Sequence, residues 1–266
     1  MAKPLLRWAG SKQQLVAELA QYWSENFGRY VEPFAGSARL FFRLEPKVAL
    51  LGDINADLIA TYCEVRDNPV AVHRALSGVE NNSDRYYEIR GKNPDALESA
   101  ERASRFIYLN RFCFNGLYRT NLKGAFNVPY GGKRSGRLPT LEELRAIGTL
   151  LKRATIVCGD FAETIADVGP YDFVYLDPPY SVSAKRVFRQ YNSADFDSGD
   201  LDRLRETLEE LNEKGARFLL SYDDSEEGER LAEGFHKRNV RTRRNIAGFT
   251  GSRRIASELL ISNSCV

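Results

Sequence analysis

The chain has 266 residues, of which 43 % are hydrophobic, and its 38 basic and 36 acidic side chains give a net charge of +2. This composition is typical of a globular protein, and no apolar run approaches the roughly 20 residues that a membrane-spanning helix needs. The N-terminal residues lack the apolar core of a signal peptide, and the four cysteines lie far apart without a metal-binding spacing. We therefore expect an intracellular protein with reduced thiols and no metal site.

Five short apolar runs alternate along the chain with longer amphipathic stretches. The runs are typical of strands buried on both faces of a sheet, and each leads into a polar or acidic residue; in chain order they are 29–31, 48–51, 155–158, 173–176 and 217–220. Helical patterns fall at 55–65, 141–151 and 201–211, and Thr140 with Glu143 has the spacing of a capping box. The alternation predicts an α/β fold with a mostly parallel, doubly wound sheet, whose ligand lies at the carboxyl ends of the strands.

The alternation breaks between about residues 66 and 140, which we interpret as an inserted, mainly helical domain. From Arg102 to Thr140 there are eight basic residues and no acidic one, interleaved with aromatic residues. That pattern suits a nucleic acid, because Lys and Arg neutralise phosphates and aromatic rings stack on bases. The alternative is a solvated basic face over a local aromatic core.

Residues 240–262 have the pattern of two strands joined by a turn at 248–254, which predicts a C-terminal hairpin. The hairpin would carry a second basic patch, which consists of Arg241, Arg243, Arg244, Arg253 and Arg254.

The most specific motif is Asp177-Pro178-Pro179-Tyr180, directly after an apolar run. Two consecutive prolines remove two backbone donors and restrict the turn, so carbonyl oxygens there lack local partners. The Asp177 carboxylate and the Pro178 carbonyl can accept the two hydrogens of an amino group on an aromatic base, which leaves the nitrogen lone pair able to attack a methyl group. The Tyr180 ring can stack on the base, a contact worth roughly 1–3 kcal/mol. The alternative is a tight turn with an incidental aspartate.

Three further strand ends carry candidate ligand-binding residues. In Glu32-Pro33-Phe34-Ala35-Gly36, the glycine lets the backbone approach a ligand closely at a strand-to-helix turn. Asp53 is placed to accept hydrogen bonds from ribose hydroxyls. Asp160 can accept from an adenine amino group while Phe161 stacks on the ring. Helix capping is the alternative role for both aspartates.

Two other segments complete the candidate site. Arg7-Trp8-Ala9-Gly10-Ser11-Lys12 precedes the first helix, and its Trp8 and Lys12 can close the site over a cofactor; the alternative is a capped helix with a buried tryptophan. In the segment 110–119, Arg and Asn side chains can read base edges, and an exposed aromatic ring can fill the gap left by an extruded base. Contact with phosphates alone is the other interpretation.

With these motifs in this order, the sequence resembles the DNA adenine methyltransferase (Dam) family over nearly its whole length. The matching strings lie at 7–12, 32–36, 52–55, 110–119, 126–131, 177–180, 253–255 and 258–260. The resemblance implies S-adenosylmethionine as the methyl donor, transfer to N6 of a flipped-out adenine, and GATC as the family's usual site. It also implies a catalytic domain formed by 1–65 and 141–266, and a target-recognition domain formed by 66–140.

The motifs and the resemblance together assign the site residues. The catalytic set is Asp177, Pro178 and Tyr180. The cofactor-binding set is Trp8, Lys12, Phe34, Gly36, Asp53, Asp160, Phe161 and Asp177. The DNA-binding set is Arg7, Arg111, Phe114, Asn115, Arg119 and Tyr130.

Double-stranded DNA is the expected partner, and a cognate restriction endonuclease is a further partner that the family allows. We expect a cytoplasmic protein of prokaryotic or phage type. Two alternatives stay open from the residues alone. One is a catalytically inactive DNA-binding regulator, and the other is a methyltransferase that acts on RNA adenine, on cytosine N4 or on a protein glutamine.

Overall fold

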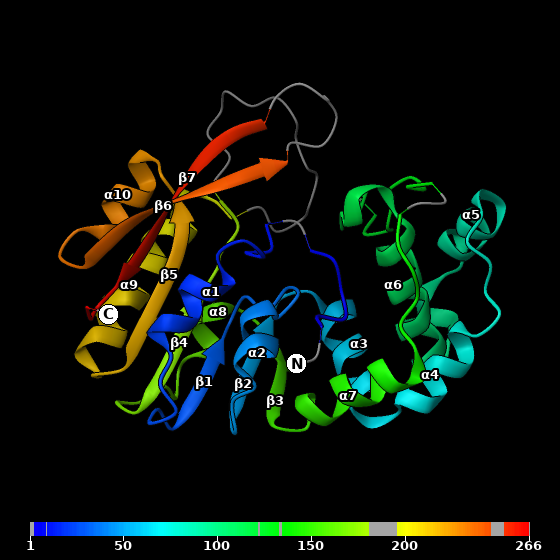
Figure 1. Ribbon diagram of the computed structural model, residues 1–266, viewed down its shortest axis with the longest axis horizontal. Coiled ribbons are helices and arrows are strands. Elements are labelled where there is room, and N and C mark those ends of the chain that lie inside the picture. Colours follow the sequence, from blue (N-terminus) through cyan, green and yellow to red (C-terminus); the bar gives the residue numbers. More distant parts are fainter. Residues whose placement is uncertain are drawn as a thin grey trace.

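The structure is a computed structural model that describes residues 3–8, 10–121, 123–132, 135–180, 196–245 and 253–265, except for the side chains of 242–245 and 253–256. Within these residues a seven-stranded sheet lies between helices on its two faces (Figure 1). The strands are β1 (Arg29–Glu32), β2 (Ala49–Asp53), β3 (Ala154–Cys158), β4 (Asp172–Leu176), β5 (Arg217–Asp223), β6 (His236–Asn245) and β7 (Arg253–Ser262).

The helices alternate with the parallel strands. They are α1 (Val16–Leu19), α2 (Arg39–Leu44), α3 (Ala56–Asp67), α4 (Pro69–Leu76), α5 (Ser83–Gly91), α6 (Ser99–Phe112), α7 (Leu141–Leu151), α8 (Phe161–Thr164), α9 (Ser198–Glu213) and α10 (Glu226–Ala232). Three 3-10 segments are η1 (Ala20–Tyr22), η2 (Pro94–Ala96) and η3 (Phe114–Gly116). The predicted capping box is present at α7, where Thr140 Oγ1 accepts from the Glu143 N–H and the Glu143 carboxylate accepts from the Thr140 N–H.

The sheet order is β3-β2-β1-β4-β5-β7-β6. Strands β1 to β5 are parallel, whereas β7 is antiparallel to both of its neighbours. The prediction of a mostly parallel α/β sheet is therefore confirmed. The residues that would connect β6 to β7 lie outside the described part of the chain, so the hairpin stays a prediction.

Successive residues of the central strands face opposite sides of the sheet, as a period of two requires. Tyr30, Leu51 and Phe173 belong to one buried cluster, which continues into α2, α3, α6 and α7. Val31, Leu50 and Val174 belong to a second cluster, which is covered by α8, α9 and α10. The sheet is thus the middle layer of three, and both of its faces are apolar.

One strand departs from the prediction of burial on both faces. Thr155 and Cys158 of β3 are exposed, and Ile156 and Val157 are only partly buried. The reason is position, because β3 is the edge strand of the sheet and is paired on one side alone. The prediction of a strand at 155–158 is confirmed, and the prediction of its burial was wrong.

The order of the strands fixes where a ligand can lie. From β1 the chain continues to β2 and β3 on one side of the sheet, and later to β4 and β5 on the other. Tyr30 is paired with Ala49 of β2 and with Phe173 of β4. The connections after β1 and β4 therefore run to opposite sides of the sheet and leave a crevice between them, which is where open α/β sheets bind ligands.

The stretch 66–140 forms α4, α5, α6 and irregular loops beside the β3 side of the sheet, away from β6 and β7 (Figure 1). Its buried side chains, such as Ile107 of α6, belong to the same cluster as Tyr30 of β1. The helices of this stretch thus share a core with the sheet. The domain boundaries at 66 and 140 stay a prediction.

Candidate active site

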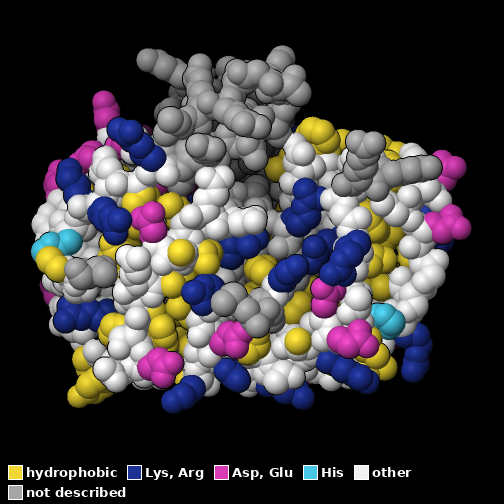
Figure 2. All heavy atoms as spheres, viewed as in Figure 1, with side chains coloured by type: hydrophobic (Ala, Val, Ile, Leu, Met, Phe, Trp, Pro, Cys, Tyr) yellow, Lys and Arg dark blue, Asp and Glu magenta, His cyan; other side chains and the backbone are white. Residues whose placement is uncertain are grey.

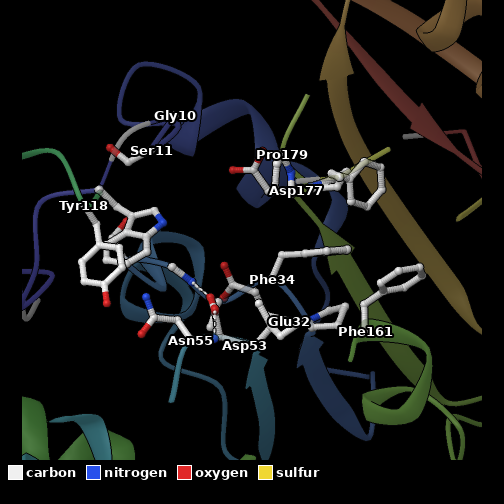
Figure 3. Close-up of a pocket in the computed structure, with 18 of the residues that line it drawn as sticks. Gly10, Ser11, Glu32, Phe34, Asp53, Asn55, Tyr118, Phe161, Asp177 and Pro179 are labelled. Atoms are coloured by element: carbon white, nitrogen blue, oxygen red, sulfur yellow. Dashed lines mark hydrogen bonds between the residues drawn. The ribbon is translucent and has the colours of Figure 1, made fainter. Parts of the chain in front are cut away.

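A cavity of about 960 Å³ opens at the carboxyl ends of β1, β2, β3 and β4. Glu32 and Asp53 end β1 and β2, and Asp160 and Asp177 follow β3 and β4, so acidic residues at four strand ends surround one space. Figure 3 shows Glu32, Asp53 and Asp177 on this wall, with Tyr118 at one side and Phe34 and Phe161 at the other. The predicted cofactor-binding residues and the predicted catalytic loop therefore line a single cavity.

The turn after β1 is shaped by Gly36. Its φ of +46° lies in the left-handed region, and a Cβ built there would lie 2.8 Å from Cδ1 of Trp8. Its N–H donates to Asp53 Oδ2 at 2.9 Å, and the Asn55 N–H donates to Asp53 Oδ1 at 2.9 Å. Burial raises the pKa of Asp53, although both N–H donors oppose that rise. Because Asn55 caps α3, the helix-cap alternative for Asp53 is not observed.

The adenosyl ligand stays a prediction from the sequence, and if it binds here, we expect Gly36→Ala to weaken its binding by at least tenfold. The added methyl group would displace Trp8 from the cavity wall, and the left-handed backbone costs a residue with a Cβ roughly 1–2 kcal/mol. Calorimetric titration with S-adenosylhomocysteine measures the effect. The matched control is Gly78→Ala, because Gly78 also has a positive φ but a Cβ there meets no atom within 4 Å. Equal losses in both variants would mean that the approach of Trp8 is unimportant.

Asp160 and Phe161 are placed by the turn between β3 and α8. Asp160 Oδ1 accepts from the Ala162 N–H at 2.9 Å and caps α8, and the Asp160 carboxylate also pairs with Arg203. The capping alternative is thus observed, together with a place on the cavity wall. The Phe161 ring is buried and stacks on Phe34 with centroids 5.1 Å apart. Phe34 is the more exposed of these two rings.

Lys12 connects the N-terminal segment to the predicted catalytic loop. Its buried ammonium lies 2.9 Å from Asp177 Oδ1 and 3.5 Å from Glu258 Oε2, and it donates to the Tyr180 hydroxyl at 2.5 Å. Burial by itself would lower the pKa of Lys12, but the negative charges of Asp177 and Glu258 and the Tyr180 hydroxyl raise it overall. Burial raises the pKa of Asp177, and the charge of Lys12 opposes that rise.

The loop after β4 presents two acceptors. Pro178 is buried and Pro179 is exposed, and both line the cavity with Asp177. Among the residues that the structure describes, none donates a hydrogen bond to the Pro178 carbonyl. The Tyr180 ring packs edge-on against Tyr222, with centroids 5.3 Å apart, and lies beneath the Lys12 ammonium. The loop therefore combines a fixed aromatic ring with a carboxylate and a carbonyl.

Three site residues were missed by the sequence reasoning. Glu32 is buried on the cavity wall, accepts from the Tyr30 hydroxyl at 2.9 Å, and has a pKa that burial raises well above its ordinary value. Tyr118 stacks on Trp8 with centroids 5.6 Å apart and also lines the cavity. Glu258 reaches Lys12 from β7. Glu32 could have been found from the sequence, because it stands in the motif Glu32-Pro33-Phe34-Ala35-Gly36. Tyr118 and Glu258 could not, because their contacts with Trp8 and Lys12 join distant segments of the chain.

The six predicted DNA-binding residues fall into two groups. Phe114 and Asn115 are exposed, and Asn115 has a φ of +55° in the η3 turn. Arg119 donates to Asn127 Oδ1 at 2.8 Å, and the Tyr130 hydroxyl donates to Asn81 Oδ1 at 2.8 Å, and both side chains are half-buried. These four residues lie in the segment that follows α6.

The other two residues of the set, Arg7 and Arg111, bind backbone carbonyls. Arg7 donates to the carbonyls of Arg111 and Ser135, and Arg111 donates to the Leu5 carbonyl at 2.5 Å. The two guanidinium groups thus tie the N-terminal segment to the loops after α6. Gly136 and Gly116 also lie close to them, since a Cβ at Gly116 would lie 2.6 Å from the Arg7 Cβ.

Most of the basic residues between 102 and 140 have internal partners. Arg102 pairs with Asp57 at 2.7 Å and Arg137 pairs with Glu143, while Arg105 donates to the carbonyls of Ile89 and Arg90. Several aromatic residues of the stretch, such as Phe106 and Phe112, are buried in the core. The pattern is therefore largely explained by packing and by internal pairing.

Basic side chains still gather on the face shown in Figure 2, between the strand ends of the sheet and α6. Of the predicted second basic patch, Arg241 is exposed. The side chains of Arg243, Arg244, Arg253 and Arg254 lie outside the described residues. In the described parts of the chain, no group of three or more His, Cys, Asp or Glu residues is arranged to hold a metal ion. None of the described helices is both long and apolar enough to cross a membrane.

A mostly parallel sheet with a cavity at the carboxyl ends of its strands has the arrangement in which open α/β proteins bind their ligands. A model of the D12 class of N6 adenine-specific DNA methyltransferases matches residues 8–246. The chain belongs to this family, and it is accordingly an adenine-specific DNA methyltransferase that acts on DNA.

Curated relatives cover nearly the whole chain. The type II methyltransferase M1.LlaDCHI of Lactococcus lactis subsp. cremoris is 33 % identical, with 98 % of this chain and 95 % of that protein covered. The type II methyltransferase M.MjaIII of Methanocaldococcus jannaschii is 34 % identical, with 92 % of each covered. The DNA adenine methylase of Escherichia coli K12 is 32 % identical, with 97 % and 94 % covered. The family resemblance drawn from the sequence is thereby confirmed.

Proposed function

We propose that this enzyme transfers a methyl group from S-adenosylmethionine to N6 of an adenine that has left a DNA duplex, in a short site such as GATC. The observation that carries the proposal is the placement of Asp177 and Pro178 on the wall of the cavity that also holds Asp53 and Gly36. The residues proposed to hold the amino group of the adenine and those proposed to hold the adenosyl part of the donor thus line the same cavity.

The residues present fit S-adenosylmethionine. Each oxygen of the Asp53 carboxylate accepts one backbone N–H and keeps a further lone pair, as ribose hydroxyls require. Gly36 permits the close approach of Trp8 to the turn after β1, which a Cβ would block, and the half-buried Phe34 ring offers a stacking surface. Asp177 also lies on this wall and offers a carboxylate to the cationic groups of the donor. The bound cofactor supplies a methyl group made electrophilic by a sulfonium centre.

The work of the protein is positioning. Asp177 and the Pro178 carbonyl accept the two amino hydrogens and aim the N6 lone pair into the cavity. Tyr180 is fixed by Tyr222 and by its hydrogen bond from Lys12, so its ring can hold an extruded adenine in one orientation. The amino group of a stacked and paired adenine is out of reach, and the base must therefore leave the duplex. Holding reactants in this way accounts for much of the rate of such reactions.

The loops after α6 are the proposed DNA contact. Phe114 and Asn115 are exposed and can enter or border the gap that the adenine leaves. Arg119 and Tyr130 support the same surface. Arg7 and Arg111 are engaged with backbone carbonyls, so their proposed contribution is to hold these loops against the N-terminal segment while they border the DNA. A cognate endonuclease stays a prediction.

The test is to express the chain in a host that lacks DNA methylation and to sequence the genomic DNA for modified bases. We expect N6-methyladenine at one short motif, GATC or a close relative. Modified cytosine, or no modified base from a folded and soluble enzyme, would contradict the proposal. A parallel assay with labelled S-adenosylmethionine and purified duplex DNA, RNA and protein separates the donor from the acceptor.

A further inference from the structure

Among the residues that the structure describes, the basic side chains on the cavity wall are those of Lys12, Arg39 and Arg102. Lys12 lies 2.9 Å from Asp177, and Arg102 lies 2.7 Å from Asp57. Arg39 differs from both, because no carboxylate of a described residue lies within ion-pair distance of its guanidinium. Among the described lining residues, Arg39 is thus the cation that lacks an acidic partner.

Arg39 has little local stabilisation. It is half-buried at the first position of α2, and its Nε is buried and donates to no atom that the structure describes. The N-terminal end of a helix is partly positive, so α2 itself repels this charge. Burial lowers the pKa of Arg39, and no acidic side chain opposes that effect. A buried donor without a partner is costly, which points to an anion that is bound when the site is in use.

Two anions can reach such a position, namely the carboxylate of the donor's amino-acid part and a DNA phosphate. The wall around Arg39 favours the carboxylate. Arg39 follows Gly36 by three residues and shares the cavity wall with Trp8, Lys12 and Asp53, whereas the exposed Phe114 and Asn115 of the proposed DNA contact do not line this cavity. The planar guanidinium also matches a carboxylate with two parallel hydrogen bonds.

We propose that Arg39 binds the α-carboxylate of the amino-acid part of the methyl donor. The inference rests on the proposed function, since it assigns one end of the donor within the same cavity. With the donor carboxylate at Arg39, the Asp177 carboxylate on the same wall remains for the donor ammonium.

The test compares two ligands by calorimetry. S-Adenosylhomocysteine has the carboxylate, and S-adenosyl-3-thiopropylamine has the same ammonium but no carboxylate. The unaltered enzyme should prefer the first ligand by roughly 10- to 100-fold, as one charge-assisted pair of hydrogen bonds provides. In Arg39→Met the preference should vanish, with the affinity for the amine unchanged. Arg39→Lys keeps the positive charge but loses the two parallel N–H donors, so it should show an intermediate preference. This variant replaces Arg39→Met in the test if the methionine variant does not fold.

The matched control is Arg43→Met, because Arg43 lies on the same helix and is exposed. It should leave both affinities unchanged. An Arg39→Met variant that still prefers S-adenosylhomocysteine overturns the proposal, and so does one that loses affinity only for duplex DNA, since a phosphate would then be the bound anion. If the unaltered enzyme binds neither adenosyl ligand, the donor assignment and the role of Arg39 both fail. If the unaltered enzyme prefers S-adenosylhomocysteine and Arg39→Met keeps that preference, the role of Arg39 fails while the donor assignment stands.

Discussion

Asp177→Asn is expected to lower the rate of methyl transfer by about 10²- to 10³-fold, with duplex binding nearly unchanged. The substitution keeps the shape of the side chain but replaces one acceptor oxygen by an NH₂ group, which repels an amino hydrogen. Removing a single preorganised electrostatic contact costs about this much in other enzymes. The Glu258 carboxylate still faces Lys12 in this variant, so the buried ammonium keeps one acidic partner.

Single-turnover transfer from labelled S-adenosylmethionine to a duplex measures the chemical step, and fluorescence anisotropy measures duplex binding. The control is Asp202→Asn, an exposed aspartate that pairs with Arg230 and does not line the cavity. Full activity in Asp177→Asn would remove the carboxylate from the mechanism. A loss of duplex binding as large as the loss of rate would assign Asp177 to DNA contact.

Lys12→Met is expected to lower the free energy of unfolding by about 3–5 kcal/mol at about pH 8, the cost of leaving buried charge without its partner. The ammonium lies between Asp177 and Glu258, and its side chain is 6 % exposed. Without it, two carboxylates face each other's charge in a poorly solvated space. Urea unfolding followed by circular dichroism measures the change.

The deficit of Lys12→Met should shrink as the pH falls from about 8 towards about 5. The pKa of Asp177 is already raised by burial, and losing the positive charge of Lys12 raises it further. A carboxyl group with a raised folded-state pKa binds a proton more readily in the folded state, so its stability contribution is present at low pH and lost as the pH rises. The control is Lys214→Met, whose exposed pair with Glu210 is worth under about 1 kcal/mol. A deficit that is constant with pH would contradict the charge argument.

The strands and the acidic residues at their ends could be predicted because both are local signals. Apolar runs such as 173–176 indicate a strand wherever it lies in the sheet, and Asp177 follows directly. The exposure of β3 could not be predicted, since the order of strands in a sheet is set by packing between distant segments. The role of the basic and aromatic residues in 102–140 could not be predicted either, because it depends on partners from distant segments. Arg102 and Arg105 would have the same sequence signature whether they bound phosphate or, as observed, Asp57 and backbone carbonyls.

The contact between Lys12 and Glu258 has a consequence for the order of assembly. The two residues are separated by more than 200 residues of sequence, and β7 must pair with β5 before Glu258 can reach Lys12. Contacts of such long separation close late in folding, because the intervening chain must first be ordered. On the ribosome, the Gly36 turn and the Asp177 loop therefore emerge well before the site acquires its final balance of charge. Until β7 has been synthesised and has paired with β5, the site lacks Glu258 and the charge that Glu258 sets against Lys12.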